Sequence, residues 1–482
     1  MSDITLSRKI NNSFKWSFVG QICAKLTNPI STMILARILA PEIFGITTAV
    51  TMVISFCEII ADSGFAKYLI QHDFESKEKY EKSFSVAFYV SIFLSLIMFA
   101  VIIAFAGPIS SLISNSGYEK ILMFSAIQIP IYTVNSMYNA DLRREFKFKK
   151  IFISSLASIA TPFLITVPLA LLNFSYWSLV VGSIASILFQ TIILTFFSKT
   201  KLKLFFSFKL LKEMFAYSIS MVIEAILIWL CSWAAVFIVG KFYDAYHVGL
   251  FKVSISTVAS IFAILSTTVT SVLFPSFSRL KNDEVEFKKI FVNSQKITLC
   301  IAVPLGVGAL LFSKLITFIF LGSQWSDASL GIGLISMAFA LKCCYSYFLS
   351  EVFRSKGNYV HSIIFQALMF IIQIILFLTL GKISYDWAVY SYLISNLSYV
   401  VVSIIYLIAK YKFNLIELIK PLKAPLISSI FMFVLFLPSF FFNYGFLQQI
   451  GIILIMSIGY FSFMAIFFRK SFKEVVAFVL RK

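Results

Sequence analysis

Charged residues are scarce in this sequence, and acidic residues are the scarcest. Only 13% of the 482 residues are charged, and 22 Asp and Glu stand against 41 Lys and Arg, whereas 60% of the residues are hydrophobic. A soluble domain needs more polar surface than this composition supplies. The composition therefore excludes a soluble globular protein and predicts an all-α, polytopic membrane protein.

Motifs for nucleotide hydrolysis and for hydrolytic catalysis are missing. The Gly-Lys pairs at 240–241 and 381–382 are followed by Phe and Ile, so neither completes a P-loop. The three histidines, His72, His247 and His361, are expected at loop edges as solvated side chains and not as ligands or bases. The predicted outer loops are too short to form a catalytic domain, and we expect that the protein is not an enzyme.

Cysteine pairs at metal-ligand or redox spacing are also missing. All six cysteines fall inside predicted spans, with no CxxC pair and no histidine at ligand spacing. We interpret them as small buried apolar residues, and we expect neither a disulfide nor a metal site nor a cofactor. The six are Cys23, Cys57, Cys231, Cys300, Cys343 and Cys344.

Long apolar stretches are abundant, and each is long enough to cross a hydrocarbon core of roughly 30 Å as a helix. We predict fourteen transmembrane helices. They lie near residues 13–37, 43–69, 84–106, 119–140, 151–172, 176–197, 214–239, 248–274, 291–312, 327–350, 360–380, 385–409, 424–442 and 447–468.

The Lys and Arg residues are distributed unevenly between the two sides of the predicted membrane. With the N-terminus inside, 30 of the 41 fall on inner segments and only five on outer ends. Positive charge accumulates on the cytoplasmic side, so we predict that both termini are cytoplasmic. No cleavage site follows the first residues, which we expect to form a retained tail. The basic runs are then contacts with anionic lipid, and no nucleic-acid partner is expected.

Two halves of the sequence resemble each other. ARILAPEIFGI (36–46) matches GKFYDAYHVGL (240–250), which makes Arg37 and Lys241 equivalent by position. Two weaker matches follow at nearly the same offset, as in transporters with internal repeats. We predict an N-terminal six-helix lobe over 1–198 and a pseudo-symmetric six-helix lobe over 199–412. Two additional helices and a basic tail follow over 413–482.

Several charged side chains fall inside the predicted spans, where facing lipid would cost each roughly 2.5–3.5 kcal/mol. They can pair with one another, for example Lys25 with Glu58 or Asp62, and merely orient helices. The cations nevertheless outnumber the acids, which predicts a cavity that binds an anion. The cations are Lys25, Lys252, Lys296 and Lys342 within spans and Arg37 and Lys241 at the outer mouth; the acids are Glu58, Asp62 and Glu224.

Arg37 and a pair of tryptophans each have two interpretations. Arg37 can be an interfacial residue whose long side chain reaches the headgroups. Trp229 and Trp233 lie four residues apart beside Glu224. They can stack on sugar rings, but packing or an interfacial belt is favoured.

Four segments carry a resemblance to a known family: ILARILAPEIFGITTAV (34–50), DLRREFKFKK (141–150), VGKFYDAYHVGLFKVS (239–254) and FPSFSRLK (274–281). On these residues the chain resembles the Wzx-type oligosaccharide flippases of the multidrug/oligosaccharidyl-lipid/polysaccharide superfamily. The resemblance implies two six-helix lobes around a central cationic cavity, plus two helices. It also implies a monomer that moves undecaprenyl-diphosphate-linked oligosaccharide repeat units out of the cytoplasmic leaflet by alternating access.

The resemblance carries expectations about residues and partners. The positions that match the family's functional charges are Lys25, Arg37, Asp62, Glu224 and Lys241, the last often Arg in the family. Lys25, Arg37, Lys241 and Lys252 would hold the diphosphate or acidic sugars. Glu58, Asp62 and Glu224 would orient these cations or bind H⁺ or Na⁺. The expected setting is the bacterial cytoplasmic membrane, where membrane lipids, a polysaccharide polymerase and other assembly proteins are partners. The glycan would be an O-antigen, a capsule or an exopolysaccharide.

Two rival functions remain open on the sequence. A multidrug-extrusion antiporter coupled to cations would favour an acidic cavity, and the surplus of cations disfavours it. A membrane glycan polymerase or transferase would need catalytic carboxylates on a sizeable outer loop. The outer acids are scattered on short loops instead: Glu42, Asp244, Asp327 and Asp386.

Overall fold

The computed structural model describes residues 16, 20, 23–25, 27–113, 117–263, 265, 273, 276–280, 283–440 and 444–480. In these residues the secondary structure is helical, without a strand. The contacts of the chain divide it into two compact units, unit 1 over Met1–Gly249 and unit 2 over Leu250–Lys482. The predicted lobe boundary at residue 198 stays a prediction.

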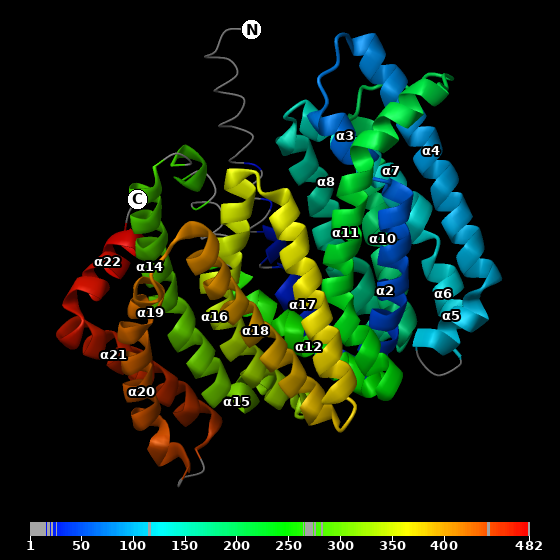
Figure 1. The fold of residues 1–482 in the computed structure, drawn as a ribbon. Helices are drawn as coiled ribbons and strands as arrows, with labels where there is room; N and C mark the ends of the chain where they lie inside the picture. The colour runs from blue at the N-terminus through cyan, green and yellow to red at the C-terminus, as the bar shows by residue number, and fades with distance from the viewer. Residues whose placement is uncertain are drawn as a thin grey trace. The chain divides into compact units, whose positions relative to one another are not determined.

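Unit 1 is a bundle in which the long helix α4 runs beside α7, and α10 packs on both α7 and α8 (Figure 1). Its elements are α2 (Pro41–Asp62), α3 (Phe65–Gln71), α4 (Lys77–Ala104), α5 (Ala106–Ile113), α6 (Glu119–Ser125), α7 (Gln128–Arg144), α8 (Phe148–Thr161), the π-helix η1 (Pro162–Thr166), α9 (Val167–Leu171), α10 (Tyr176–Phe197) and α11 (Phe208–Phe242).

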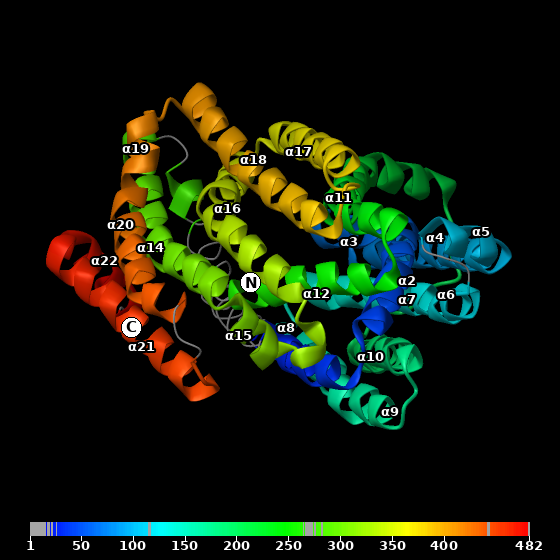
Figure 2. The same ribbon diagram turned by 90° about the horizontal axis from the view of Figure 1, so that it is seen from below.

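Unit 2 is built on α14, α16 and α18, and the C-terminal helices α20 to α22 lie together beside α14 (Figure 2). The helix α12 (Ala245–Ile261) begins in unit 1 and continues into unit 2. The other elements are α14 (Glu284–Leu311), α15 (Ser313–Phe320), η2 (Ser323–Trp325), α16 (Ala328–Lys356), α17 (Tyr359–Thr379), α18 (Tyr385–Tyr411), α19 (Leu415–Ile419), η3 (Lys420–Leu422), α20 (Lys423–Phe436), η4 (Leu437–Phe440), α21 (Phe446–Phe467) and α22 (Arg469–Leu480).

Eleven helical segments of the described chain are long and apolar enough to cross a membrane. Each coincides with one of the fourteen predicted spans, which confirms the all-α polytopic fold. The other three predictions have different outcomes. The span at 13–37 falls partly outside the described residues, and so does the span at 248–274 beyond α12. The span at 119–140 is divided into α6 and α7.

Two of the predicted spans are broken by local chemistry. The helix at 43–69 ends at Asp62, because Ser63 and Gly64 both have positive φ, at 46° and 72°. The span at 119–140 divides at Ala126 and Ile127, after which α7 carries polar side chains along much of its length. An α-helix with polar residues inside a membrane protein must turn them toward protein or water. This part of unit 1 is therefore where a polar site is to be sought.

Aromatic side chains fill the cores of both units. In unit 1, Phe84 and Leu142 are fully buried between α4 and α7. In unit 2, Phe291 of α14 stacks edge-on against Phe348 of α16, with ring centroids 5.3 Å apart. Four of the six cysteines are buried, as expected for small apolar residues.

Candidate functional site

The two cations of the sequence repeat occupy equivalent positions. Arg37 lies near the end of the helix that precedes α2, and Lys241 lies in the last turn of α11, where a cation interacts favourably with the helix dipole. Both side chains are exposed. Exposure leaves both the binding of an anion and an interfacial role open for Arg37.

The glycines of the same repeat lie against each other's segment. A Cβ on Gly45 would come within 1.8 Å of the Ala245 carbonyl oxygen. In the repeat, Gly45 corresponds to Gly249 and Ala245 to Pro41. Small residues let two helices approach at backbone distance in a membrane. The N-terminal turns of α2 and α12 are therefore in close backbone contact through repeat-equivalent residues.

Two of the predicted binding cations are engaged by side chains of unit 2. The Lys296 ammonium lies 2.7 Å from the Glu474 carboxylate of α22. The Lys342 ammonium donates a hydrogen bond of 2.8 Å to Asn396 Oδ1 and lies 4.8 Å from the centre of the Tyr399 ring. A cation that is neutralised within the protein has less attraction left for an anionic substrate. Of the other span cations, Lys25 and Lys252 are half-buried.

The three predicted acids are half-buried and differ in their contacts. Asp62 accepts a hydrogen bond of 2.6 Å from the Ser136 hydroxyl of α7. Within the described residues, neither Glu58 nor Glu224 forms a hydrogen bond or an ion pair, and Asp62 forms no ion pair within 4 Å. The charge-pairing and ion-coupling roles of these acids stay predictions.

The tryptophan of α11 nearest to Glu224 packs inside unit 1. Trp229 donates a hydrogen bond of 2.9 Å from Nε1 to Ser55 Oγ, and its ring centre lies 4.9 Å from that of Phe56. Both partners belong to α2. Packing, the favoured interpretation of Trp229, agrees with these contacts.

Comparison with known families decides where this chain belongs. Residues 34–330 match the family described as polysaccharide biosynthesis protein. The chain belongs to this polysaccharide biosynthesis protein family. The membership agrees with the expected Wzx-type resemblance, and the eleven candidate spans of the described residues make this chain a multi-pass membrane protein.

Relatives of this chain are named for the biosynthesis or transport of polysaccharides. The succinoglycan biosynthesis transport protein ExoT of Rhizobium meliloti is 22% identical over 338 residues, 70% of this chain and 68% of ExoT. The lipopolysaccharide biosynthesis protein WzxC of Escherichia coli is 19% identical over 67% of this chain and 65% of WzxC. The aligned segment thus spans about two thirds of the length of these relatives.

Solved structures share the fold of this family member. The lipid II flippase MurJ in an inward closed conformation has a TM-score of 0.70 at 18% identity, covering 95% of this chain and 99% of MurJ. An inward-facing multidrug resistance transporter of the MATE family has a TM-score of 0.64 at 14% identity, covering 82% of this chain and 96% of that chain. At these identities the likeness shows that the chain shares the fold of the two proteins.

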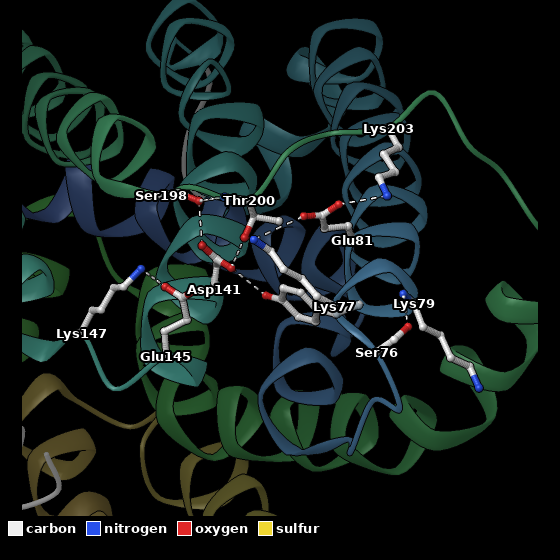
Figure 3. Close-up of polar contacts among 11 residues, drawn as sticks. Ser76, Lys77, Lys79, Glu81, Asp141, Glu145, Lys147, Ser198, Thr200 and Lys203 are labelled. Atoms are coloured by element: carbon white, nitrogen blue, oxygen red, sulfur yellow. Dashed lines mark hydrogen bonds and ion pairs between the residues drawn. The ribbon is translucent and has the colours of Figure 1, made fainter. Parts of the chain in front are cut away.

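A buried carboxylate that the sequence did not single out organises one end of unit 1. Asp141 is fully buried and accepts hydrogen bonds from Tyr80, Ser198 and Thr200, at 2.8, 2.7 and 2.5 Å (Figure 3). Beside it, the Glu81 carboxylate pairs with Lys203 at 3.0 Å. The cluster ties the segment after α10 to α4 and α7.

Two acidic residues that join separate segments of the fold could not be recognised from the sequence, for different reasons. The partners of Asp141 are 57 to 61 residues away in the chain, so no local pattern reveals them. Glu474 follows the last predicted span and lies in the segment predicted to be a basic tail. The signal that could have found it is the amphipathic spacing of residues 469–480, which form α22.

Proposed function

We propose that this protein moves undecaprenyl-diphosphate-linked oligosaccharide repeat units across the bacterial cytoplasmic membrane for surface polysaccharide assembly. The observation that carries the proposal is the family match over residues 34–330. Names of relatives add a supporting pattern, because succinoglycan, lipopolysaccharide and O-antigen are all polysaccharides or contain them. Both termini would lie in the cytoplasm.

The charge of the chain suits this substrate. A diphosphate brings at least two negative charges to the membrane, and a glycan cannot cross hydrocarbon unaided. Lys25, Arg37, Lys241 and Lys252 are the cations we assign to the diphosphate or to acidic sugars, because charge-assisted hydrogen bonds to phosphate are strong. Asp62 and Glu224 would orient these cations or carry a coupling ion, H⁺ or Na⁺.

The transport cycle we infer is alternating access. The cations would receive the headgroup on the cytoplasmic side, the protein would close that side and open the other, and the glycan would leave. Membrane lipids surround the chain throughout. A polysaccharide polymerase that receives the repeat unit is an expected partner.

The decisive experiment replaces the repeat-related cations in cells that depend on this protein. Arg37→Ala, Lys25→Ala and the double variant Arg37→Ala/Lys241→Ala are compared with Lys120→Ala, an exposed lysine with no assigned role. We expect surface polysaccharide to fall at least tenfold in the double variant, while lipid-linked repeat units accumulate on the cytoplasmic side. Unchanged surface polysaccharide at normal protein levels would overturn the assignment of these cations.

A further inference from the structure

A polar cavity lies inside unit 1, between α2, the α6–α7 junction and α10. Its volume is about 330 Å³. One face of α2 lines it with Thr47, Thr51, Ser55 and Glu58, residues three or four apart and thus on one side of the helix. The opposite walls add Ser125, Gln128 and Ser183 with the apolar side chain of Leu179, and Phe44 of α2 adds a second apolar contact.

The hydroxyl groups of this cavity present acceptors. Thr47 donates its proton to the Ile43 carbonyl at 2.9 Å, and Thr51 donates to the Thr47 carbonyl at 2.7 Å. Ser183 donates to the Val180 carbonyl at 2.8 Å. A hydroxyl that has given its proton to the main chain keeps its lone pairs for a ligand. The cavity therefore favours a ligand that donates several hydrogen bonds.

Three further polar groups in the cavity wall lack partners within the described chain. The Glu58 carboxylate and the Gln128 amide form no hydrogen bond there, and the Ser125 hydroxyl is buried without a partner. Buried polar groups are almost always hydrogen-bonded, because leaving them unpaired is costly. This rule applies to the buried Ser125 hydroxyl, whereas the Glu58 and Gln128 side chains are half-buried and line the cavity, so a single ligand bound there can satisfy all three groups.

Size and shape distinguish among the candidate ligands. The cavity volume of about 330 Å³ is near the lower limit for ligand pockets, whose volumes are roughly 300–1,000 Å³. It is far larger than a single water or bare ion needs, about 30 Å³ of liquid volume. Polar walls with apolar patches match a sugar ring, which has hydroxyls at its edge and C–H groups on its faces.

We propose that this cavity binds one uncharged sugar residue of the transported glycan, through hydrogen bonds donated by the sugar hydroxyls. The assignment rests on the proposed function and replaces the ion-coupling role expected of Glu58. Among the described lining residues Glu58 alone is charged, so no lysine or arginine there would pair with an acidic sugar. A uronic acid would bury a second carboxylate without a counter-ion and is disfavoured.

Binding of simple glycosides to the purified full-length protein in lipid nanodiscs tests the proposal. The probes are methyl glucoside and methyl glucuronide, followed by saturation-transfer NMR. We expect methyl glucoside to bind and methyl glucuronide to bind at least fivefold more weakly. Glu58→Gln and Gln128→Ala should each weaken methyl glucoside binding about three- to tenfold, the effect of losing one hydrogen-bonding group.

The matched control is Gln190→Ala, which removes an amide on α10 that does not line the cavity. It should leave glycoside binding unchanged. If a cavity variant does not fold, Thr51→Val is used in its place. Thr51 lies at an exposed position of α2, and valine keeps the shape of its side chain. Equal loss in Gln190→Ala, or equal binding of the two glycosides, would overturn the proposal.

Two further outcomes separate this proposal from the proposed function. A spectral change that depends on Na⁺, with no glycoside bound, would make the cavity a cation site and overturn the sugar assignment. If the wild-type protein restores surface polysaccharide in a deletion strain but binds no glycoside, the cavity assignment fails and the flippase function stands. Failure to restore surface polysaccharide would contradict the proposed function itself.

Discussion

Gly249 lies against the backbone of Gly45. A Cβ added to Gly249 would come within 3.1 Å of the Gly45 nitrogen and 2.0 Å of the Pro41 carbonyl oxygen. In the converse contact Gly45 approaches Ala245, and these two residues are the repeat equivalents of Gly249 and Pro41. Reciprocal contacts of this kind are what a two-fold relation between two segments produces. The repeat of the sequence therefore has a structural counterpart at the N-terminal ends of α2 and α12.

Substitution of either glycine should force these helix ends apart. We expect Gly45→Ala and Gly249→Ala each to destabilise the protein by about 1–3 kcal/mol, the cost of overpacking, because backbone atoms cannot move aside as a side chain can. The measurement is thermal stability by fluorescence-detected size-exclusion chromatography. Gly107→Ala is the control, since a Cβ there meets nothing within 4 Å. An unchanged melting temperature in both glycine variants would contradict the close contact.

Removal of the Asp141 carboxylate should loosen the segment after α10. Asp141→Ala leaves the Tyr80, Ser198 and Thr200 hydroxyls without their acceptor, and we expect a loss of about 3 kcal/mol in stability, since hydrogen bonds to charged groups contribute roughly 1.5–3 kcal/mol. Trypsin should then cleave faster within residues 198–207. Ser198→Ala, which removes one donor, should have a smaller effect. Equal cleavage rates in wild type and Asp141→Ala would show that the cluster does not fix this segment.

The ion pair between Lys296 and Glu474 predicts rescue by charge exchange. Lys296→Glu alone places two carboxylates side by side and should lower both stability and the amount of folded protein. The double variant Lys296→Glu/Glu474→Lys restores opposite charges and should recover both, together with surface polysaccharide. If stability returned but transport did not, Lys296 would act on substrate after all, as the sequence first suggested.

Asp244 predicts a pH dependence at the start of α12. Its carboxylate accepts hydrogen bonds from His247 N at 3.1 Å and from His247 Nδ1 at 2.6 Å. Partial burial alone would raise the pKa of Asp244, but the hydrogen bonds from His247 lower it below the usual value. A lowered pKa in the folded state means that the ionised group stabilises the fold above its unfolded pKa and loses this effect in acid.

We therefore expect Asp244→Ala to melt below the wild type at pH 7. The difference should be small, because the Asp244 side chain is 64% exposed. It should shrink as the pH falls below about 4, where the carboxylate is protonated. Asp244→Asn keeps a side-chain acceptor at the helix start and should show a weaker pH dependence. A difference that is constant from pH 7 to 3.5 would contradict the lowered pKa.

Most membrane-spanning helices of this molecule could be predicted from the sequence, because the membrane requires them to be apolar. Eleven spans follow from apolar length alone, because every helix facing lipid must be apolar along about 20 residues. The division of 119–140 could not be predicted in this way, since α7 is screened by other helices and tolerates polar residues such as Gln128 and Ser136. A hydropathy pattern identifies helices that face lipid, but it does not identify helices that pack mainly against other helices.

The candidate site was predicted in composition more than in geometry. The sequence identified the charged side chains inside spans, including Glu58 and Lys296. It could not reveal that Lys296 is neutralised by Glu474, 178 residues away. It also counted no hydroxyls, although those of α2 and α10 form most of the polar wall around Glu58. Serine and threonine in a helix satisfy themselves on the main chain, so their second role depends on which face meets a cavity.

The Asp141 cluster limits how far the N-terminal end of α11 can lie from α4 and α7. Ser198 and Thr200 donate hydrogen bonds to Asp141. Lys203 is held by two contacts: its main-chain nitrogen donates a hydrogen bond of 2.9 Å to Ser85 Oγ, and its ammonium forms an ion pair with Glu81. Only residues 204–207 then separate Lys203 from the first turn of α11. Four residues reach about 14 Å at full stretch. While these contacts hold, the first turn of α11 stays within about that distance of Lys203.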